Sequence, residues 1–309
     1  MKNILITGCA GFIGRKLTIH LLKKKYKIFG IDDLSTGNLE NLICNKKNFF
    51  FIRGDCNNKN VLSKIKDNIQ IIIHLAGQSS GELSFYNPKN DFKRNFLTTI
   101  NLLEFYKKKK CKQFIYSSSM SVYGNSKINP VNEKNICDPV SFYGQSKLSS
   151  ENYIRLYSKH NINYTILRLF NVYGPGQLLN NLNQGLIRIY LNQIFNTNKL
   201  FIKGSKNRFR DFIYIDDVIK IIELVIENKK CYNQVFNLGF GKKYFIKDLV
   251  KLLKKKIKKK FTIKYKKGTP LDQFGIYSKS NKIFKAVNYK PIIDLDKGLN
   301  LFIKSLLKK

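Results

Sequence analysis

The sequence predicts an α/β protein: a doubly wound parallel β-sheet, followed by a smaller α/β domain. Short apolar runs alternate with helix-like segments through the first 170 residues, and a glycine-rich turn follows the first run. Parallel strands need long crossover connections, which helices usually supply, so this alternation is typical of a parallel sheet covered by helices. A chain of 309 residues is long enough for a sizeable core and for two such units.

Six segments of the first half are predicted to be strands, because each is a short apolar run rich in β-branched or aromatic residues. In chain order they are KNILITG, YKIFGIDD, FFFIRGD, IQIIIHLAG, KQFIYSSS and INYTILRLFN. The segments between them have helical periodicity. The expected helices are GFIGRKLTIHLLKKK, NVLSKIKD, FYGQSKLSSENYIRLYSKH and one long helix, PKNDFKRNFLTTINLLEFYKKK.

The pattern is looser after about residue 170, where a loop at GPGQ precedes the helix-like NQGLIRIYLNQIFN. FRDFIYIDDVIKIIELVIE reads as a strand and then a helix, and YNQVFNLG returns to a strand. We expect residues 1–170 to form a first domain, to which residues 212–238 return, and residues 171–309 to form a second domain.

The net charge of +37 raises the alternative of a nucleic-acid-binding protein. The lysines are spread from end to end, however, and the dense run 254-KKKIKKK-260 belongs to an amphipathic segment. A single helical stripe of that segment holds Ile246, Leu249, Val250, Leu253 and Ile257, which leaves its lysines on the solvated face. We therefore expect no specific nucleic-acid partner.

The six cysteines form no CxxC pair, and no cluster of cysteine and histidine has metal-ligand spacing, so no metal site is expected. No apolar run is long enough to span a bilayer, which predicts no membrane partner. The N-terminal segment lacks the pattern of a signal peptide. Reduced thiols in the cytoplasm are the resulting expectation.

The glycine-rich turn, GCAGFIG, places Gly8, Gly11 and Gly14 between the first strand and the first helix. Glycines there permit a tight turn, close approach of the backbone to a pyrophosphate, and close packing of helix on strand. The N-terminus of the helix supplies free N–H groups for phosphate. A plain glycine-rich connection is the alternative, but the context favours a dinucleotide site.

Acidic residues end the second and third predicted strands. Asp32 follows Gly8 by 24 positions, and a carboxylate there accepts hydrogen bonds from ribose hydroxyls and repels a 2′-phosphate, which favours NAD over NADP. Its neighbour Asp33 is the alternative for this role. Asp55, in RGDC, could meet the adenine or cap the next helix.

Tyr143 and Lys147 stand four residues apart in YGQSK and share one face if the segment is helical. This pattern arises often by chance, so its surroundings matter. Ser119 ends the fifth predicted strand, at the edge where doubly wound folds bind ligands. An ammonium beside a phenol would lower the pKa of the phenol, so that the tyrosine can exchange a proton near neutral pH. The three residues could take a proton from a carbinol while its hydride leaves for a nicotinamide.

Taken together, these motifs resemble the extended short-chain dehydrogenase/reductase family, in its nucleotide-sugar epimerase branch, over nearly the whole chain. The motifs, in the family's order, are TGCAGFIG, IDDLSTGN, GDCNN, HLAGQ, SSSMSVYG, YGQSK, RLFNVYGPGQ, RFRDFIYIDDV and FNLGFG. The resemblance implies a Rossmann-type fold, NAD as the cofactor, a nucleotide sugar as the substrate, and a homodimer.

The resemblance also implies roles for individual residues. The catalytic residues would be Ser119, Tyr143 and Lys147. The nucleotide sugar would contact Ser119, Asn171, Arg210 and, in the loop 268-GTPLDQFGIY-277, Asp272. The NAD site would comprise Gly8, Gly11, Phe12, Ile13, Gly14, Asp32, Asp55, Cys56, Leu75, Ala76, Gly77, Asn95, Tyr143 and Lys147. Arg210 would meet the diphosphate, because a guanidinium forks onto phosphate oxygens; a salt bridge to Asp211 is the alternative.

Three departures from the family pattern bear on the reaction. Dehydratases and decarboxylases of the family carry an acid just after the catalytic hydroxyl of the serine strand, where this chain has Met120 and Ser121, so elimination of water is not expected. The segment 77-GQSSGELSF-85 lacks the lysine that UDP-galactose-type epimerases often carry there, so UDP-glucose is not assured. Lys266 or Lys267 replaces the family's usual arginine before the last substrate loop.

The expected activity is NAD-dependent epimerisation of a nucleotide sugar, at C4 of a UDP-hexose, through a transient 4-keto sugar. A nucleotide-4-keto-sugar reductase or another epimerase is the alternative within the same fold. From a different class comes a basic, non-catalytic RNA-binding protein with an NAD fold. The presence of Ser119, Tyr143, Lys147 and Arg210 argues against that class, because a binding module needs none of them.

Overall fold

The computed structural model describes residues 2–39, 42, 47–177, 185–268 and 273–307. Its centre is a seven-stranded parallel sheet with the strand order β11-β6-β5-β4-β1-β2-β3. The predicted doubly wound parallel sheet is confirmed, and each of the six predicted strands is present. The strands are β1 (Asn3–Thr7), β2 (Lys27–Asp32), β3 (Phe49–Arg53), β4 (Ile71–His74), β5 (Gln113–Ser119), β6 (Tyr164–Leu169) and β11 (Gln234–Leu238).

Side chains of β1 alternate between the two faces of the sheet, as the pleat requires. Ile4 and Ile6 belong to one buried cluster and Leu5 to another, and all three are fully buried. Apolar residues on both faces explain why the parallel strands read as continuous apolar runs in the sequence.

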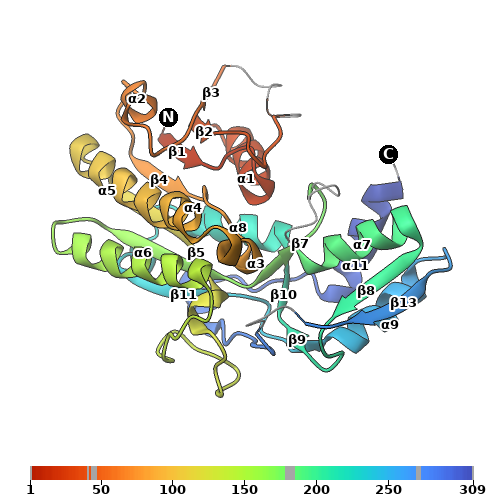
Figure 1. Ribbon diagram of the computed structural model, residues 1–309. Helices are drawn as coiled ribbons and strands as arrows, with labels where there is room; N and C mark the ends of the chain where they lie inside the picture. Colours follow the sequence, from red (N-terminus) through yellow and green to blue (C-terminus); the bar gives the residue numbers. More distant parts are fainter. Residues whose placement is uncertain (1, 40–41, 43–46, 178–184, 269–272, 308–309) are drawn as a thin grey trace.

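Helices cover both faces of the sheet (Figure 1). The face that holds Ile4 packs against α1 (Phe12–Lys23) and α8 (Ile215–Val225), which contact each other. The face that holds Leu5 packs against α2 (Lys59–Ser63), α5 (Thr98–Lys109) and α6 (Phe142–Ser158). Alternating strands and helices therefore produce the two helical layers that the sequence pattern predicts.

The long helix predicted after Pro88 is divided by a π-helical turn. α4 (Pro88–Phe92) is followed by the π-helical segment η1 (Lys93–Leu97) and then by α5. Two side chains occupy backbone carbonyls at this turn: the Thr98 hydroxyl donates to Lys93 O at 3.2 Å, and the Thr99 hydroxyl donates to Asn95 O at 2.8 Å. The turn interrupts the regular ladder and buries Asn95 completely.

A second lobe lies at one end of the sheet, on the right of Figure 1. Three two-stranded pairs stand outside the main sheet: β10 with β7, β12 with β9, and β13 with β8. The strand β8 is an addition to the predicted elements. The elements of this lobe are β7 (Asn171–Tyr173), α7 (Leu186–Thr197), β8 (Lys199–Lys203), β9 (Phe209–Arg210), β10 (Phe212–Tyr214), β12 (Tyr244–Phe245), α9 (Ile246–Lys256), β13 (Thr262–Lys266) and α11 (Leu295–Leu307). The helix α10 (Asn281–Val287) instead contacts β11 and α8 beside the main sheet.

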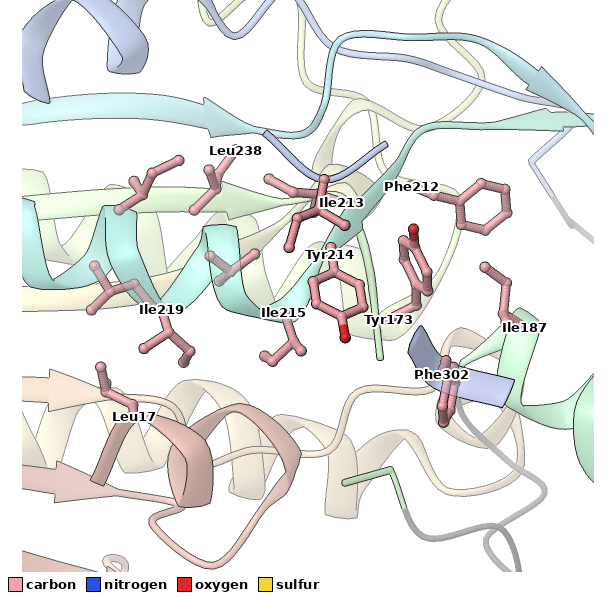
Figure 2. Close-up of a cluster of buried hydrophobic side chains, with 14 of the residues drawn as sticks. Leu17, Tyr173, Ile187, Phe212, Ile213, Tyr214, Ile215, Ile219, Leu238 and Phe302 are labelled. Carbon is pink, nitrogen blue, oxygen red and sulfur yellow. The ribbon is translucent and has the colours of Figure 1, made fainter. Parts of the chain in front are cut away.

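The hydrophobic core is continuous from the sheet into this lobe (Figure 2). Leu17 of α1 faces Ile219 of α8, while Phe302 of α11 and Ile187 of α7 lie near Tyr173 of β7. All five side chains are buried. Burial of this shared apolar surface holds the lobe and the sheet together.

The lysine-rich helix α9 has the amphipathic character that the sequence predicts. Ile246, Leu249, Val250 and Leu253 are buried, whereas its lysines lie outside this stripe and most are exposed. Nowhere in the described ranges is there a helix whose length and hydropathy would let it cross a bilayer. Within the same ranges, no group of His, Cys, Asp and Glu side chains could hold a metal ion.

Candidate active site

A cleft of about 370 Å³ opens beyond the carboxyl ends of the sheet strands, where doubly wound folds bind ligands. Its walls come from the turns after β1 and β4, the end of β5, α6, β7 and the first turn of α7. A smaller hollow of about 90 Å³ adjoins it and shares the glycine turn. The cleft is lined by the predicted site residues Gly8, Gly11, Phe12, Ile13, Gly14, Leu75, Gly77, Ser119, Tyr143, Lys147 and Asn171.

The glycine turn between β1 and α1 tolerates no side chain at Gly8 or at Gly14. A Cβ on Gly8 would lie 2.7 Å from the Ala76 nitrogen, and Gly8 has a φ of +71°, which favours glycine. A Cβ on Gly14 would clash with the Gly8 carbonyl. Gly11 is the N-cap of α1, with no capping side chain. The first turn of α1 therefore presents bare N–H groups to the cleft, as an anion site requires.

Asp32, at the end of β2, stabilises the glycine turn through hydrogen bonds. Its carboxylate accepts hydrogen bonds from Ala10 N at 2.9 Å and from Leu34 N at 2.8 Å. Burial raises the pKa of Asp32, and these backbone hydrogen bonds act in the opposite direction. The side chain is mostly buried and lines the smaller hollow, where its remaining lone pairs face the space beside the glycine turn.

Asp33, the alternative to Asp32, already forms an ion pair with one arginine and hydrogen bonds with one serine. It pairs with Arg94 at 2.8 Å and accepts two hydrogen bonds from Ser35, at 2.9 Å from its N–H and at 2.6 Å from its hydroxyl. Burial alone would raise the pKa of Asp33, but hydrogen bonds from Ser35 and the charge of Arg94 lower it below its ordinary value. This arrangement leaves Asp32 as the better placed of the two carboxylates for a ribose.

The smaller hollow also contains Asp55 and Cys56, which follow β3. Asp55 accepts hydrogen bonds from Asn57 N at 2.9 Å and from Asn57 Nδ2 at 3.0 Å, so it forms the turn before α2 as well as lining the hollow. The N-cap of α2 is Asn58, and Asp55 does not cap the helix. The other predicted residues in the hollow are Gly8, Gly11, Asp32, Leu75, Ala76 and Gly77.

Asn95, in the π-helical turn, lies directly behind the turn after β4. A Cβ on Gly77 would lie 2.5 Å from Asn95 Oδ1. Asn95 Nδ2 donates to Asp91 at 3.0 Å, but Oδ1 is buried and has no hydrogen-bond partner within the described ranges. A buried acceptor without a partner indicates a place where a ligand or a water molecule donates a hydrogen bond.

Ser119, Tyr143 and Lys147 meet in the large cleft. Tyr143 lies in the first turn of α6, whose N-cap Ser141 accepts a hydrogen bond from Gly144 N at 3.1 Å. Lys147 follows one turn later, and its Nζ lies 6.0 Å from the centroid of the Tyr143 ring. Ser119 is the last residue of β5, and its hydroxyl accepts a hydrogen bond from Ser121 N at 3.1 Å.

The electrostatics of this trio differ from the prediction that Lys147 lowers the pKa of the phenol. Burial raises the pKa of Tyr143 to about 12, and a hydrogen bond with Ser119 opposes this increase. Burial also lowers the pKa of Lys147 to about 8. Tyr143 is 7% exposed and Lys147 is 4% exposed, so the loss of water is the largest influence on the pKa of each.

Of the four predicted substrate residues, Ser119 and Asn171 reach the cleft, and Asn171 Nδ2 donates to Asp211 O at 3.0 Å. Arg210 is not among the described residues that line the cleft; its Nη1 donates to Phe209 O at 2.8 Å and to Phe274 O at 3.2 Å. The buried Asp211 carboxylate is held by hydrogen bonds from Phe240 N, Gly241 N, Ser278 N and the Ser278 hydroxyl. Asp272 lies outside the described residues.

Two arginines line the cleft that the sequence analysis did not single out, Arg15 and Arg188. Arg15 follows Gly14 in α1 and donates to Gly176 O at 3.0 Å, which links the two walls of the cleft. Arg188 lies in the first turn of α7 and is buried. The sequence held a signal for Arg188, because a charged residue interrupts the otherwise apolar segment GLIRIYL.

A buried ion pair fixes α6 against the sheet. Glu151, one turn after Lys147, accepts hydrogen bonds from Arg168 Nε at 2.9 Å and Nη2 at 2.7 Å. It also accepts a hydrogen bond from the Ser118 hydroxyl at 2.5 Å. Ser118 precedes Ser119 on β5, and Arg168 lies on β6. Glu151 therefore ties α6, the helix of Tyr143 and Lys147, to β6 through Arg168 and to β5, the strand of Ser119, through Ser118.

Comparisons with known proteins agree with this geometry. Residues 4–239 match the NAD dependent epimerase/dehydratase family. A curated protein of Methanocaldococcus jannaschii, described as a putative UDP-glucose 4-epimerase, is 34% identical over 299 residues, which are 96% of this chain and 95% of that protein.

Solved structures extend the similarity to the whole fold. The UDP-glucose 4-epimerase of Thermotoga maritima, solved with UDP-glucose, is 32% identical with a TM-score of 0.94, covering 99% of both chains. The UDP-glucuronic acid 4-epimerase of Bacillus cereus, in complex with UDP-glucuronic acid and NAD, is 33% identical with a TM-score of 0.91, also covering 99% of both chains.

Proposed function

This chain belongs to the NAD-dependent epimerase/dehydratase family, and from that premise we propose that it epimerises a nucleotide sugar at C4 of a UDP-hexose. One observation carries the proposal: Tyr143, Lys147 and Ser119 line the same cleft as the glycine turn after β1. An acid–base residue beside a dinucleotide site is what reversible oxidation of a carbinol requires.

The residues present fit NAD. Gly8 and Gly14 leave no room for a side chain at their own positions, and the N-terminus of α1 offers N–H groups to a pyrophosphate. Asp32 faces the hollow where a ribose would lie, and Asn95 Oδ1 offers an unused acceptor behind Gly77. When bound, NAD accepts a hydride from C4 of the sugar and returns it.

The chain's own residues handle the proton and the orientation of the sugar. The Tyr143 phenolate takes the proton of the C4 hydroxyl and gives it back after the 4-keto sugar has turned over. Lys147 stabilises the phenolate, and Ser119 hydrogen-bonds the oxygen at C4. Asn171 and Arg210 hold the nucleotide sugar, Arg210 at the diphosphate, together with Asp272. Because the 4-keto sugar would present its opposite face after it has turned over, hydride supplied by bound NAD would give the epimer.

The relatives favour a UDP-hexose as the substrate, and the residues after Ser119 favour epimerisation as the reaction. The relatives compared above are described as acting on UDP-glucose or UDP-glucuronic acid. Met120 and Ser121, at the start of the short helix η2 (Met120–Tyr123), follow Ser119 where a dehydratase of the family would carry an acid. Epimerisation is therefore favoured over loss of water, and a 4-keto-sugar reductase is the second candidate within the fold.

The proposed function is tested by offering the purified protein UDP-, dTDP-, GDP- and CDP-sugars, and by assaying the cofactor released on denaturation. We expect tightly bound NAD and formation of a C4 epimer without net NADH. Net consumption of NADH with a 4-keto sugar would identify a reductase. No turnover, together with nucleic-acid retention that falls steeply with salt, would support the non-catalytic alternative.

The wild-type protein is expected to bind NAD more tightly than NADP, because Asp32 would face a 2′-phosphate. Asp32→Ala should narrow this preference by weakening NAD binding more than NADP binding. Calorimetric titration of the cofactor-free protein measures both affinities, and Asp216→Asn serves as a control for loss of one surface carboxylate. Tighter binding of NADP than of NAD by the wild type would overturn the role of Asp32.

The two lobes divide the work in this proposal. Residues 1–170, with residues 212–238, would bind NAD, and the rest of residues 171–309 would bind the nucleotide sugar. The cytoplasm is the proposed location, since all five cysteines within the described ranges are free thiols. No specific nucleic-acid or membrane partner is proposed, because the lysines of α9 lie outside its buried stripe and most are exposed.

A homodimer is proposed through the outer face formed by α4, the π-helical segment η1 and α6. Phe92, Leu97, Tyr153 and Leu156 are exposed there, and Phe96 packs edge-on against Tyr153 with ring centroids 4.8 Å apart. An apolar face of this kind marks an association surface, and a second copy would bury it symmetrically.

Leu97→Glu with Leu156→Glu is expected to convert this dimer to a monomer, because burial of two carboxylates opposes association. Light scattering should give twice 36.0 kDa for the wild type and 36.0 kDa for the variant. Ile292→Glu, at an exposed residue of the other lobe, is the control and should leave the mass unchanged. A wild-type monomer would refute the proposal.

A further inference from the structure

A second carboxylate is buried behind the proposed catalytic pair. Asp91, in α4, is 1% exposed and has no part in the mechanism above. Its Oδ1 accepts hydrogen bonds from Gln78 Nε2 and Asn95 Nδ2, each at 3.0 Å. Its Oδ2 accepts a hydrogen bond from the Ser146 hydroxyl at 2.8 Å. A buried charge with only neutral donors is costly unless a cation lies near.

The three donors come from three separate elements around the cleft. Gln78 follows Gly77 in the turn after β4 and itself lines the cleft. Asn95 lies in the π-helical turn, and Ser146 precedes Lys147 on α6. Asp91 therefore links the turn, the π-helical segment and the helix of Tyr143 through one carboxylate.

Lys147 is the cation whose charge acts on this carboxylate. It follows Ser146 directly on α6, and a Cβ on Gly77 would lie 3.6 Å from its Nζ and 2.5 Å from Oδ1 of Asn95, the amide that donates to Asp91. Lys147 Nζ donates to Ser117 O at 3.0 Å, which satisfies a hydrogen bond but does not neutralise the ammonium. Asp91 and Glu151 are the two carboxylates that raise the pKa of Lys147, Asp91 by the larger amount. Glu151 is already paired with Arg168 and Arg155, so its charge is shared.

We propose that Asp91 is a positioning residue that holds α6 against the cleft and acts as the counter-ion of the Lys147 ammonium. The inference rests on the proposed function, because it assigns Lys147 a charge that the proposed proton transfer uses. A purely structural hydrogen-bond centre is the competing explanation, and it makes no demand on the charge of Asp91.

The charge of Asp91 has a predicted effect on both members of the pair. Asp91 raises the pKa of Lys147, and it also raises the pKa of Tyr143. Loss of its charge should therefore shift both limbs of a pH–rate profile to lower pH, whereas loss of a structural contact should lower the profile without shifting it. The other titratable groups near Lys147 are His74 on β4, Tyr116 on β5, and Tyr143 and Glu151 on α6.

The first test needs no substrate. The pKa of Lys147 is lowered to about 8 by burial, so the unfolded state binds more protons between that pH and the ordinary lysine pKa, and stability rises with pH in that window. Urea unfolding gives the free energy of unfolding of wild type and of Lys147→Met at each pH from 7 to 10. The difference between the two curves isolates the rise in stability that Lys147 causes, which we call the Lys147 step. Asp91→Asn should move the step down by roughly one pH unit, and Asp91→Asn on the Lys147→Met background should show none.

The second test is the pH–rate profile with the nucleotide sugar that the wild type converts. Asp91→Asn should shift both limbs down by roughly one pH unit, and Asp91→Glu should restore them in part. Ser146→Ala removes one hydrogen bond but no charge, so it should leave the limbs in place. Asp216→Asn, at an exposed carboxylate of α8, is the control for net charge.

The outcomes separate the two proposals. A wild type that converts no nucleotide sugar refutes the proposed function but leaves the unfolding test decisive for Asp91. An unchanged Lys147 step in Asp91→Asn, or the same shift with Ser146→Ala as with Asp91→Asn, refutes the counter-ion role. If Asp91→Asn fails to fold, the same comparison is made with Asp91→Ser, which also removes the charge and should move the step down by roughly one pH unit, whereas an unchanged step refutes the counter-ion role.

Discussion

Replacement of Tyr143 by phenylalanine is expected to lower turnover of the nucleotide sugar by about 10²–10⁴-fold, the usual contribution of general acid–base catalysis. The substitution removes one hydroxyl from a side chain that is 7% exposed and keeps the ring in its packing. The proton of the C4 hydroxyl then has lost the phenolate oxygen that the proposed mechanism uses as its acceptor. NAD should still bind, because the glycine turn and Asp32 do not depend on this hydroxyl.

The measurement is turnover against pH, with bound NAD assayed in each variant. Tyr153→Phe, an exposed tyrosine on the same helix, is the matched control and should keep wild-type turnover. Ser119→Ala should cost less than Tyr143→Phe, because it removes one substrate hydrogen bond and leaves the base. Near wild-type turnover of Tyr143→Phe would mean that the tyrosine is structural.

The burial of Tyr143 sharpens this expectation. The pKa of its phenol is raised to about 12, so the protein alone holds almost no phenolate at neutral pH. The proposed mechanism requires positive charge to be present when the proton leaves, and Lys147 supplies part of it. Lys147→Met should therefore shift the acid limb of the pH–rate profile to higher pH as well as lowering its height.

Glu151→Gln is expected to destabilise the fold by about 3–5 kcal/mol, because it leaves a buried guanidinium without its carboxylate. Arg168 is 2% exposed, and its remaining hydrogen bonds go to the Tyr123 hydroxyl at 2.8 Å and to Glu133 O at 3.5 Å. Neither acceptor carries a charge. The substitution changes no volume, so packing cannot account for the loss.

Urea unfolding of wild type and of Glu151→Gln gives the difference in their free energies of unfolding, provided that both have the same dependence of this free energy on urea concentration. The control is Glu82→Gln, whose carboxylate pairs with Lys203 at 3.1 Å on the surface. An exposed ion pair of this kind contributes about 0–1 kcal/mol, so the control should change little. Equal effects of the two variants would show that the Glu151 pair is not the anchor of α6.

The sequence predicted the sheet because its signals are local. Apolar runs such as ILIT and the turn GCAGFIG specify strand, turn and helix within a few residues of each other. The spacing of Tyr143 and Lys147 within one helical turn is local in the same sense. These features need no knowledge of distant partners, and the predicted sheet and its family were confirmed.

The rest depends on contacts between distant segments. The π-helical turn at residues 93–97 is not visible in a pattern that reads as one helix. Asp91 looks like an ordinary surface residue of that helix until Ser146, 55 positions later, is placed beside it. Burial of Tyr143 reversed the expected direction of its pKa for the same reason, since desolvation depends on the whole fold.

The strand order has a consequence for synthesis. β6 ends at Leu169, but its neighbour β11 begins only at Gln234, after α7, β8 and α8 have been made. Until Leu238 leaves the ribosome, one edge of the nascent sheet exposes unpaired N–H and C=O groups. During that interval the chain can pair with a neighbouring polypeptide, and chaperones that shield strand edges should be needed most then.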